Sequence, residues 1–203
     1  EFTSYYGSIS RGYKSGGVNQ QPYLTNASRP YEPEFIQNFE IGLKRATKIY
    51  QTQLSAFYSL RKDQQVSVSS QQDKENPNSF LFYTGNAGSG TIQGFEWENT
   101  LNFSSNLNMD ASLGYLTTWV NKFTYFAAEG VEAIGGDREA AMSPKVTGSF
   151  GVHFKNNSGI FGLVQMSFKD EYYFSDSHNQ KSKPYTLLKM NIGKSFGKTM
   201  VKL

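Results

Sequence analysis

The sequence predicts an all-β fold: an antiparallel up-and-down meander of about eight strands that is part of a transmembrane β-barrel. Three observations predict it. Apolar residues recur at every second position in several segments, such as Phe95–Phe103, Leu107–Trp119 and Val146–Phe154. Short and long links alternate along the chain. The predicted strands also reach or exceed the ~9–11 residues that cross the apolar part of a bilayer.

A period of two gives each strand one apolar and one polar face, because successive side chains in a strand point to opposite sides. The polar positions of these segments are Glu96, Glu98, Asn102, Asn108, Asp110, Ser112, Lys145, Thr147, Ser149 and His153. A sheet of this kind has to cover its apolar face with a second sheet or with lipid. The strand lengths and the pattern of links favour lipid.

The composition limits the classes of function. Aromatic residues make up 15% of the 203 residues and 19 are Gly, which suits strands and tight turns better than helices. A net charge of +3 without a run of Lys or Arg argues against a nucleic-acid partner. The absence of Cys excludes disulfides and thiolate metal sites. No stretch approaches the ~18 consecutive apolar residues of a membrane-spanning helix.

The first four predicted strands are Phe2–Tyr13, Phe35–Arg45, Ile49–Gln65 and Phe80–Phe103. In the second of them Phe39, Ile41 and Leu43 share one face, and Asn38, Glu40 and Lys44 share the other. In the third, Tyr50, Leu54, Ala56, Tyr58 and Leu60 share a face. We expect the fourth strand to break near its glycines at 85–90, because Gly weakens a strand interior.

The remaining predicted strands are Leu107–Phe126, Lys145–Lys155, Ile160–Tyr173 and Tyr185–Phe196, and Thr199–Leu203 begins another. Their short turns cannot cross over to a parallel neighbour, so the sheet is expected to be antiparallel. The chain begins at Glu1 rather than Met, without a signal segment, and its last strand is unfinished. We therefore expect residues 1–203 to be a single partial β-barrel domain cut from a larger protein.

The links alternate strictly in length. The short ones are Ala46–Lys48, Ser104–Asn106, Asn156–Gly159 and Gly197-Lys198. The long ones are expected at about residues 14–33, 71–78, 127–143 and 175–183, rich in Gly, Pro, Asn and charge, with a helical turn around Arg138–Met142 in the third. All short links then lie at one end of the sheet and all long ones at the other. Outer-membrane barrels have this organisation.

Three segments resemble the C-terminal barrel portion of a TonB-dependent outer-membrane receptor. Tyr31–Lys44 resembles the family stretch L-x-P-E-x-x-x-x-x-E-x-G-x-K through Pro33, Glu34, Glu40, Gly42 and Lys44. Phe57–Gln65 followed by Tyr83–Glu98 resembles the next run through Asn86, Ala87, Gly88, Gly94, Glu96 and Glu98. Leu107–Tyr115 and Pro144–Gly151 fit the two strands after it. The resemblance covers most of residues 3–196.

The resemblance implies a plugged 22-stranded barrel in the bacterial outer membrane that imports scarce nutrients, most often a ferric siderophore and otherwise cobalamin or a glycan; a ferric siderophore is the expected ligand. It implies as partners outer-membrane lipid, the remainder of the parent barrel and its plug, and the TonB complex acting through that plug. The 203 residues contain too few strands for such a barrel and no plug segment. This chain is therefore expected to contribute part of a ligand-uptake receptor.

The residues that suggest chemistry have simpler explanations. Glu96 and Glu98 lie two apart on one strand face and are expected to line the lumen of a barrel. His153 and His178 are isolated, without a second ligand at metal spacing. We expect no catalytic residue, no metal site and no cofactor, so the chain is not expected to be an enzyme. The residues near the long-loop mouth that are candidates for ligand contact are Arg11, Tyr13, Tyr31, Phe126 and Arg138.

Two other architectures remain open from the sequence. A complete small barrel of about eight strands would serve as an anchor or adhesin, and it requires Phe2–Tyr13 to pair with Tyr185–Phe196. A soluble β-sandwich would bind carbohydrate on aromatic platforms, and it requires two apolar sheet faces packed against each other.

Overall fold

The computed structural model describes residues 1–22, 24, 26, 29–71, 73, 75–128 and 131–203, and its main element is one nine-stranded antiparallel sheet. Its strands are β1 (Phe2–Lys14), β4 (Glu34–Ala46), β5 (Tyr50–Gln71), β6 (Phe80–Ser104), β7 (Leu107–Val120), β10 (Val146–Lys155), β11 (Ile160–Lys169), β12 (Tyr185–Phe196) and β13 (Thr199–Lys202). They lie side by side in this order, so the predicted all-β meander is confirmed. In the described part of the chain no helix is long and apolar enough to cross a membrane.

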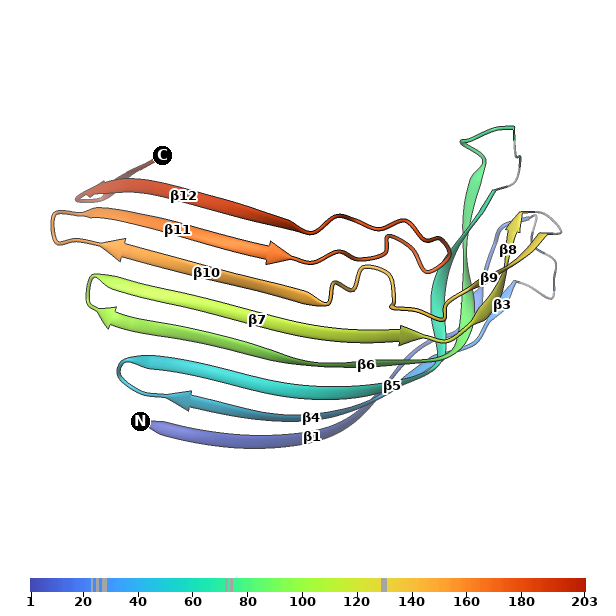
Figure 1. Cartoon of the computed structure of the whole chain (residues 1–203), viewed down its shortest axis with the longest axis horizontal. Coiled ribbons are helices and arrows are strands. Elements are labelled where there is room, and N and C mark those ends of the chain that lie inside the picture. Colours follow the sequence, from blue (N-terminus) through green and yellow to red (C-terminus); the bar gives the residue numbers. More distant parts are fainter. Residues whose placement is uncertain (23, 25, 27–28, 72, 74, 129–130) are drawn as a thin grey trace.

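Two small hairpins accompany the sheet within the long links. They are formed by β2 (Gly17–Val18) with β3 (Pro30–Tyr31), and by β8 (Phe123–Ala128) with β9 (Val131–Gly135). Figure 1 shows the short turns of the sheet gathered at one end and the long links, with these hairpins, at the other. The alternation of short and long links therefore sorts them to opposite ends of the sheet.

Several predicted element boundaries were wrong. β7 ends at Val120, and Phe123 to Phe126 belong to the separate hairpin β8–β9. β11 ends at Lys169 rather than at Tyr173. The segment Arg138–Met142 forms no helical turn: Arg138 makes a β-bridge with Val120, and Met142 has a φ of +55°, outside the right-handed helical region.

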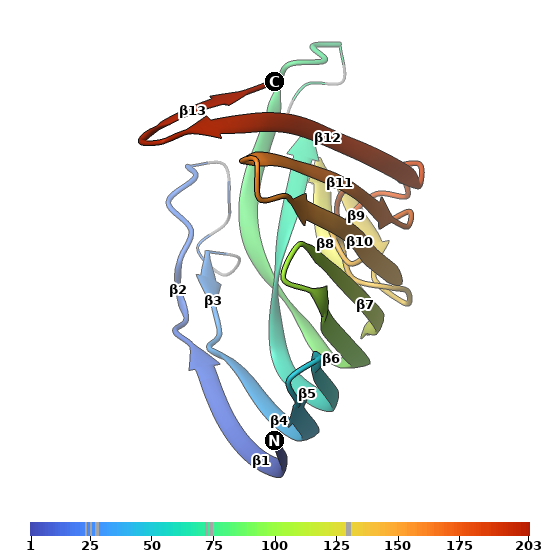
Figure 2. The ribbon, with the colours of Figure 1, turned by 90° about the vertical axis from the view of Figure 1, so that its left-hand side faces the viewer.

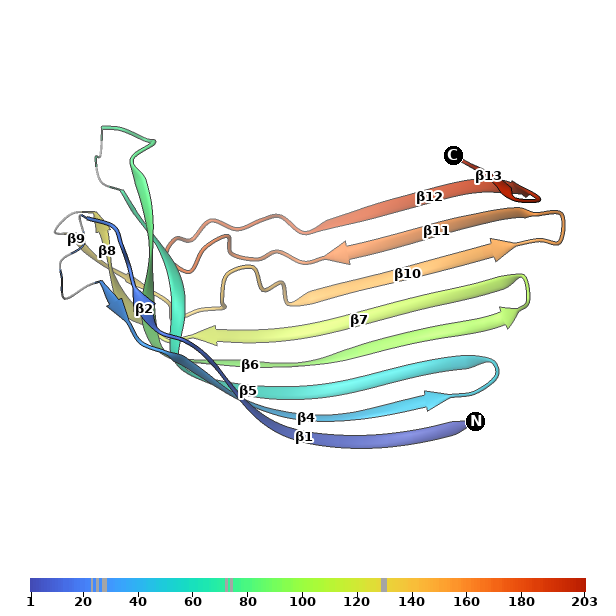
Figure 3. The ribbon, with the colours of Figure 1, turned by 180° about the vertical axis from the view of Figure 1, so that it is seen from behind.

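The predicted break in the fourth strand is a bend in a continuous strand. β6 stays paired with β5 on both sides of its glycines at 85–90, and β5 continues to Gln71 instead of ending at Gln65. At the bend, Asp63 has a φ of +54°. Its neighbours Lys62 and Gln64 are paired with β6, whereas Asp63 has no partner in the ladder. Asp tolerates this left-handed conformation better than most residues do. Figures 1 and 3 show the ends of β5 and β6 turned sharply away from the rest of the sheet.

The register places the apolar and polar residues on opposite faces of the sheet. Tyr5, Leu43, Leu54, Trp97 and Leu113 form one transverse row, and Ile9, Phe39 and Tyr58 form another on the same apolar face. The neighbouring rows hold Ser4, Lys44, Gln53, Glu98, Ser112 and Ser149, and Ser8, Glu40 and Phe57. The apolar face is open: Leu54 is 42% and Tyr58 39% exposed, whereas Ser55 and Ser59 beside them are 6% and 5% exposed.

The sheet is curved, and its polar face is the hollow one. Figure 2 shows the strands as an arc, with the bent ends of β5 and β6 and both hairpins on its hollow side. The long links contact polar-face residues: the backbone N–H of Ala140 donates to Thr118 Oγ1 over 2.9 Å. The buried hydrophobic cluster lies beneath these links and consists of Leu24, Val66, Val68, Tyr83, Ala87, Val120 and Phe123. The convex, apolar face has no such cover among the described residues.

The observed pairing does not favour the two other architectures. β1 pairs with β4 and β12 pairs with β11 and β13, so within the described residues the first and last long strands do not close a small barrel. The second and third sheets are two-stranded hairpins, and neither forms a layer over the apolar face.

Alternate residues of β4 hold the aromatic ring of Tyr6 on the concave face. Tyr6 lies opposite Gly42, and a Cβ atom at position 42 would overlap its ring. The Tyr6 hydroxyl donates to Glu40 Oε1 over 2.8 Å, and Lys44 Nζ lies 5.6 Å from the ring centroid. Glu40, Gly42 and Lys44 therefore all contribute to the position of the Tyr6 ring. Glu40 accepts its hydrogen bond, Gly42 leaves room for it, and Lys44 lies near its face.

Replacement of Gly42 by Ala is expected to destabilise the protein by about 1–3 kcal/mol, because the added methyl group overpacks the Tyr6 site. Gly7→Ala is the matched control on the neighbouring strand, since its Cβ would lie 3.8 Å from the nearest atom, Glu40 O. There Ala should be neutral or slightly stabilising. Unfolding in urea after refolding into detergent measures both. Equal stability of the two variants would show that the Tyr6 ring moves aside freely.

Candidate functional site

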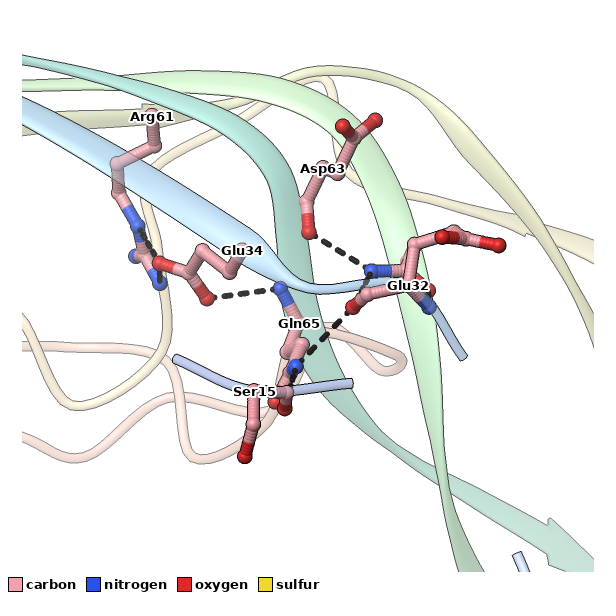
Figure 4. A network of polar contacts seen from close by, with 7 residues as sticks. Ser15, Glu32, Glu34, Arg61, Asp63 and Gln65 are labelled. Carbon is pink, nitrogen blue, oxygen red and sulfur yellow. Dashed lines mark hydrogen bonds and ion pairs between the residues drawn. The ribbon is translucent and has the colours of Figure 1, made fainter. Parts of the chain in front are cut away.

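The long-loop end of the concave face contains a polar network built around Glu34, at the first position of β4. Its Oε1 accepts from Arg61 Nε over 2.6 Å in an ion pair, and its Oε2 accepts the backbone N–H of Gln65 over 2.9 Å. The two charged side chains are only 10% and 20% exposed. Figure 4 shows Glu34 between Arg61 and Gln65 at the bend of β5. This carboxylate therefore joins the start of β4 to the bend of β5.

Gln65 and Asn86 extend the network to the first long link. Gln65 Nε2 donates to the backbone oxygens of Ser15 and Glu32 over 2.9 and 3.1 Å. The Asn86 amide accepts the backbone N–H of Glu32 over 2.8 Å and donates to the backbone oxygen of Asp63 over 2.7 Å. Both ends of the link between β1 and β4 are thus attached to the β5–β6 bend.

The residues of this network come from the segments that resemble the receptor family. Glu34 belongs to the first segment, and Asn86 and the fully buried Ala87 belong to the second. In sequence, Glu34 and Asn86 are 52 positions apart, and both bind the backbone of β5 at its bend, at Gln65 and Asp63 respectively. Glu34 and Asn86, two of the positions that match the family pattern, therefore hold the β5 bend and the first long link together at the long-loop end of the sheet, called the mouth below.

A second network holds the last two long links together through Arg138. Its Nη2 donates to the backbone oxygens of Ser175 and His178, both over 2.7 Å, and its Nη1 donates to Asn179 Oδ1 over 2.6 Å. The guanidinium also lies 4.1 Å from the ring centroid of Tyr173. Arg138 therefore directs three N–H groups of its guanidinium toward the neighbouring long link.

The loop around Ser177 connects this network to the part of β5 beyond the bend, which together with the paired part of β6 is called the extension below. Ser177 Oγ lies 3.3 Å from Ser69 Oγ, and its backbone oxygen accepts from the Tyr125 hydroxyl over 2.6 Å. Tyr83, on the extension of β6, accepts the backbone N–H of Phe126 over 2.8 Å through its hydroxyl. The extension, the β8–β9 hairpin and the last long link therefore form one connected surface at the mouth.

A cavity of about 270 Å³ opens at the same end and is lined by charged and aromatic side chains. Lys145 Nζ donates to Glu139 over 2.6 Å, which lowers the pKa of Glu139 and raises the pKa of Lys145. Lys181 Nζ donates to Glu171 over 2.9 Å, which raises the pKa of Lys181. The Nζ of Lys181 also lies 4.4 Å from the centroid of the Tyr173 ring. At neutral pH this cavity contains paired charges of both signs.

The concave wall below the mouth carries carboxylates and a histidine as hydrogen-bonding groups. Glu96 and Glu98 are exposed on this face, as predicted for a lumen wall. His153 Nε2 lies 2.5 Å from Asp110 Oδ1, so this histidine has a carboxylate partner on the neighbouring strand. Among the described residues, no group of three or more His, Cys, Asp and Glu side chains is placed to bind a metal ion.

The structure separates the five predicted contact residues into two groups. Tyr31 lies in the β2–β3 hairpin with its ring against Gly17, and Phe126 and Arg138 lie in the connected surface described above. Arg11 and Tyr13 lie in the register of Ile9 and Phe39, on the convex apolar face. The sequence already indicates this placement, because Arg11 and Tyr13 are separated from Tyr5 and Ile9 by even numbers of positions and therefore point to the same face of β1.

The family can be assigned by comparison with known proteins. A family model described as "TonB dependent receptor-like, beta-barrel" matches residues 1–202. The chain belongs to the TonB-dependent receptor-like β-barrel family. The predicted membership and the predicted place of the sheet in a transmembrane β-barrel are thereby confirmed. No curated protein matches the chain.

Solved structures of TonB-dependent receptors have the same fold. The ferric yersiniabactin uptake receptor FyuA from Yersinia pestis aligns with a TM-score of 0.73 at 18% identity, over 95% of this chain and 27% of that one. The siderophore receptor PiuA from Acinetobacter baumannii gives 0.72 at 16% identity, over 98% and 28%. The copper transporter OprC gives 0.72 at 15%, over 98% and 30%. The chain thus spans about 30% of the length of these receptors.

The sequence did not reveal the Glu34–Arg61–Gln65 network as a unit. Its only signals were the family-like positions Glu34 and Asn86, and the glycines that were interpreted as a strand break. Arg61 and Gln65 carried no signal beyond their polarity.

Proposed function

We propose that this TonB-dependent receptor barrel chain forms part of the wall and the extracellular mouth of an outer-membrane receptor for nutrient uptake. The observation that carries the proposal is the orientation of the sheet. Its convex face is mostly apolar, its concave face is mostly polar, and the described parts of the long links lie at one end on the concave side. Such a panel lines an aqueous lumen and exposes its other face to lipid.

The proposed ligand class is a ferric siderophore. Two of the structural neighbours are a ferric yersiniabactin receptor and a siderophore receptor, which supports this class. The copper transporter shares the fold at a similar TM-score, so the fold alone does not select the ligand, and we propose that the mouth contributes to the selection. Phe126, Tyr31 and Arg138 are the proposed mouth residues, with Arg138 acting through the loops that it holds in position.

The proposed partners are the remainder of the barrel, a plug within it, the TonB complex acting through that plug, and outer-membrane lipid. In this scheme the chain catalyses no reaction. Its concave hydrogen-bonding groups, such as Glu96, Glu98 and the His153–Asp110 pair, hydrate the lumen through which the ligand passes. The proposed location is the bacterial outer membrane.

Uptake by cells tests the proposal. A strain that lacks the gene containing this chain is compared with the parent strain for uptake of radioactive ferric siderophores of the catecholate, hydroxamate and phenolate types. We expect uptake of one type to fall to the level of cells de-energised with a protonophore, because transport depends on the TonB complex. A plasmid copy of the gene should restore it.

Three results would contradict parts of this proposal. Undiminished uptake of every siderophore, with loss of copper or another nutrient, overturns the ligand class. Uptake that persists in de-energised cells overturns the dependence on TonB. Recovery of the tagged receptor in a membrane-free fraction overturns the location.

A further inference from the structure

The charged residues of the main sheet are divided unequally between its two faces. Of the residues paired in the nine-stranded sheet, the charged ones on the convex face are all cations, namely Arg11, Arg45, Lys62 and Lys194. The carboxylates of the same ladder, Glu34, Glu40, Glu96, Glu98 and Asp110, all lie on the concave face. This face is mostly apolar, with a few uncharged polar residues such as Gln37, Gln93 and Asn99, and the only charges it carries in the ladder are positive.

These cations lie at the two rims of the apolar face. Arg45 pairs with Thr3 at the short-turn rim, and Arg11 is eight residues further along β1 at the long-loop rim. Eight residues span about 27 Å along a strand, or about 21 Å along the axis of a barrel with strands tilted by ~40°. This span is close to the ~25 Å apolar band of an outer-membrane barrel. The cations therefore lie at the level of lipid headgroups.

None of the four cations forms an ion pair among the described residues. Arg11, Arg45 and Lys194 lie instead 5.3, 5.8 and 5.0 Å from the ring centroids of Phe35, Tyr50 and Phe196. Long basic side chains lay their aliphatic stems along an apolar surface and extend their charge to its polar edge. These charges lack an anionic partner within the described protein.

At the long-loop rim two of the cations, Arg11 on β1 and Lys62 on β5, stand on either side of β4. Tyr13, Phe35 and Lys62 are paired in one row across β1, β4 and β5, and Arg11 covers the Phe35 ring from the adjacent row. Phe35 thus lies between two cations. At the short-turn rim, Arg45 on β4 and Lys194 on β12 are separated by most of the sheet.

We propose that Arg11 and Lys62, with Tyr13 and Phe35, form a docking site for the phosphate-bearing headgroup of an anionic membrane lipid. The unpaired positive charge complements the phosphate, and the two aromatic rings meet the apolar region just below it. The proposal rests on the membrane placement proposed above. It also gives Arg11 and Tyr13 a role on the convex face, distinct from ligand contact at the mouth.

Lipid retention by the full receptor tests the site. The wild-type protein, an Arg11→Gln/Lys62→Gln variant and a Lys155→Gln/Lys189→Gln control are reconstituted in phosphatidylcholine nanodiscs containing phosphatidylglycerol. The control removes two cations from the concave face of the same sheet. Native mass spectrometry then counts the lipids of each type that stay bound. We expect the Arg11/Lys62 variant to bind phosphatidylglycerol about tenfold or more weakly, with the control unchanged.

The other outcomes separate the two proposals. Equal loss of phosphatidylglycerol in both double variants, or no loss in either, overturns the headgroup site. If phosphatidylcholine is still retained in that case, the membrane placement stands. Displacement of the bound lipid by inorganic phosphate overturns it in favour of a free-anion site. Failure of all three proteins to retain any lipid overturns the membrane placement together with the site.

Discussion

Glu34→Gln is expected to destabilise the receptor by about 3 kcal/mol, near the low end of the range for removing one partner of a buried ion pair. The substitution preserves the shape of the side chain but leaves the mostly buried Arg61 guanidinium without its carboxylate. The low end applies because Arg61 is 20% exposed, so water solvates part of the unpaired charge. Unfolding in urea measures the loss, and amide hydrogen exchange at Gln65, whose N–H donates to Glu34 Oε2, reports it locally.

Glu98→Gln is the matched control for this substitution. It removes an exposed carboxylate from the concave face of β6. Glu98 forms no ion pair among the described residues. It should change stability by only a few tenths of a kcal/mol. The double variant Glu34→Gln/Arg61→Met removes both charges and should recover part of the loss, because no unpaired charge remains. Equal effects of Glu34→Gln and Glu98→Gln would show that the pair contributes nothing beyond a surface ion pair.

The division of the sheet into two faces could be predicted from the sequence because it depends on local alternation alone. Phe95, Trp97 and Leu113 follow the period of two, and three of the four short turns contain Gly or Asn between two such runs. Strand ends were predicted less well. The apolar residues Phe123 and Tyr125 continue the alternation of β7, yet they belong to a hairpin whose direction is set by its contacts with Tyr83 and Ser177.

The mouth could not be predicted in the same way, because it depends on contacts between residues far apart in the chain. Nothing near Asp63 indicates a positive φ, and the bend there is what brings Gln65 to Glu34. Arg138 was predicted as a ligand contact from its loop position. Its hydrogen bonds to Ser175 and His178 depend on the approach of two loops that are 37 or more residues apart.

Val164→Arg is the substitution that tests the lipid-facing side most directly. Val164 lies near the middle of β11, in a convex row with Val152 and Met190, and is 43% exposed in the isolated chain. If this face contacts the hydrocarbon region, a charge there is expected to cost about 2–4 kcal/mol, the range measured for Arg or Lys near the midplane of outer-membrane barrels. Unfolding of the receptor after refolding into lipid vesicles provides the measurement.

The neighbouring substitution Leu163→Arg separates burial in lipid from loss of an apolar side chain. Leu163 is adjacent in the same strand but lies on the concave face, between His153 and Asn191. An arginine there remains hydrated in an aqueous lumen, so Leu163→Arg should be clearly less destabilising than Val164→Arg. The difference should also disappear when both proteins are unfolded from small detergent micelles, which let a long side chain reach water. Equal destabilisation in vesicles would mean that the convex face does not contact the membrane interior, whereas a difference between adjacent residues requires the two faces to be in different solvents.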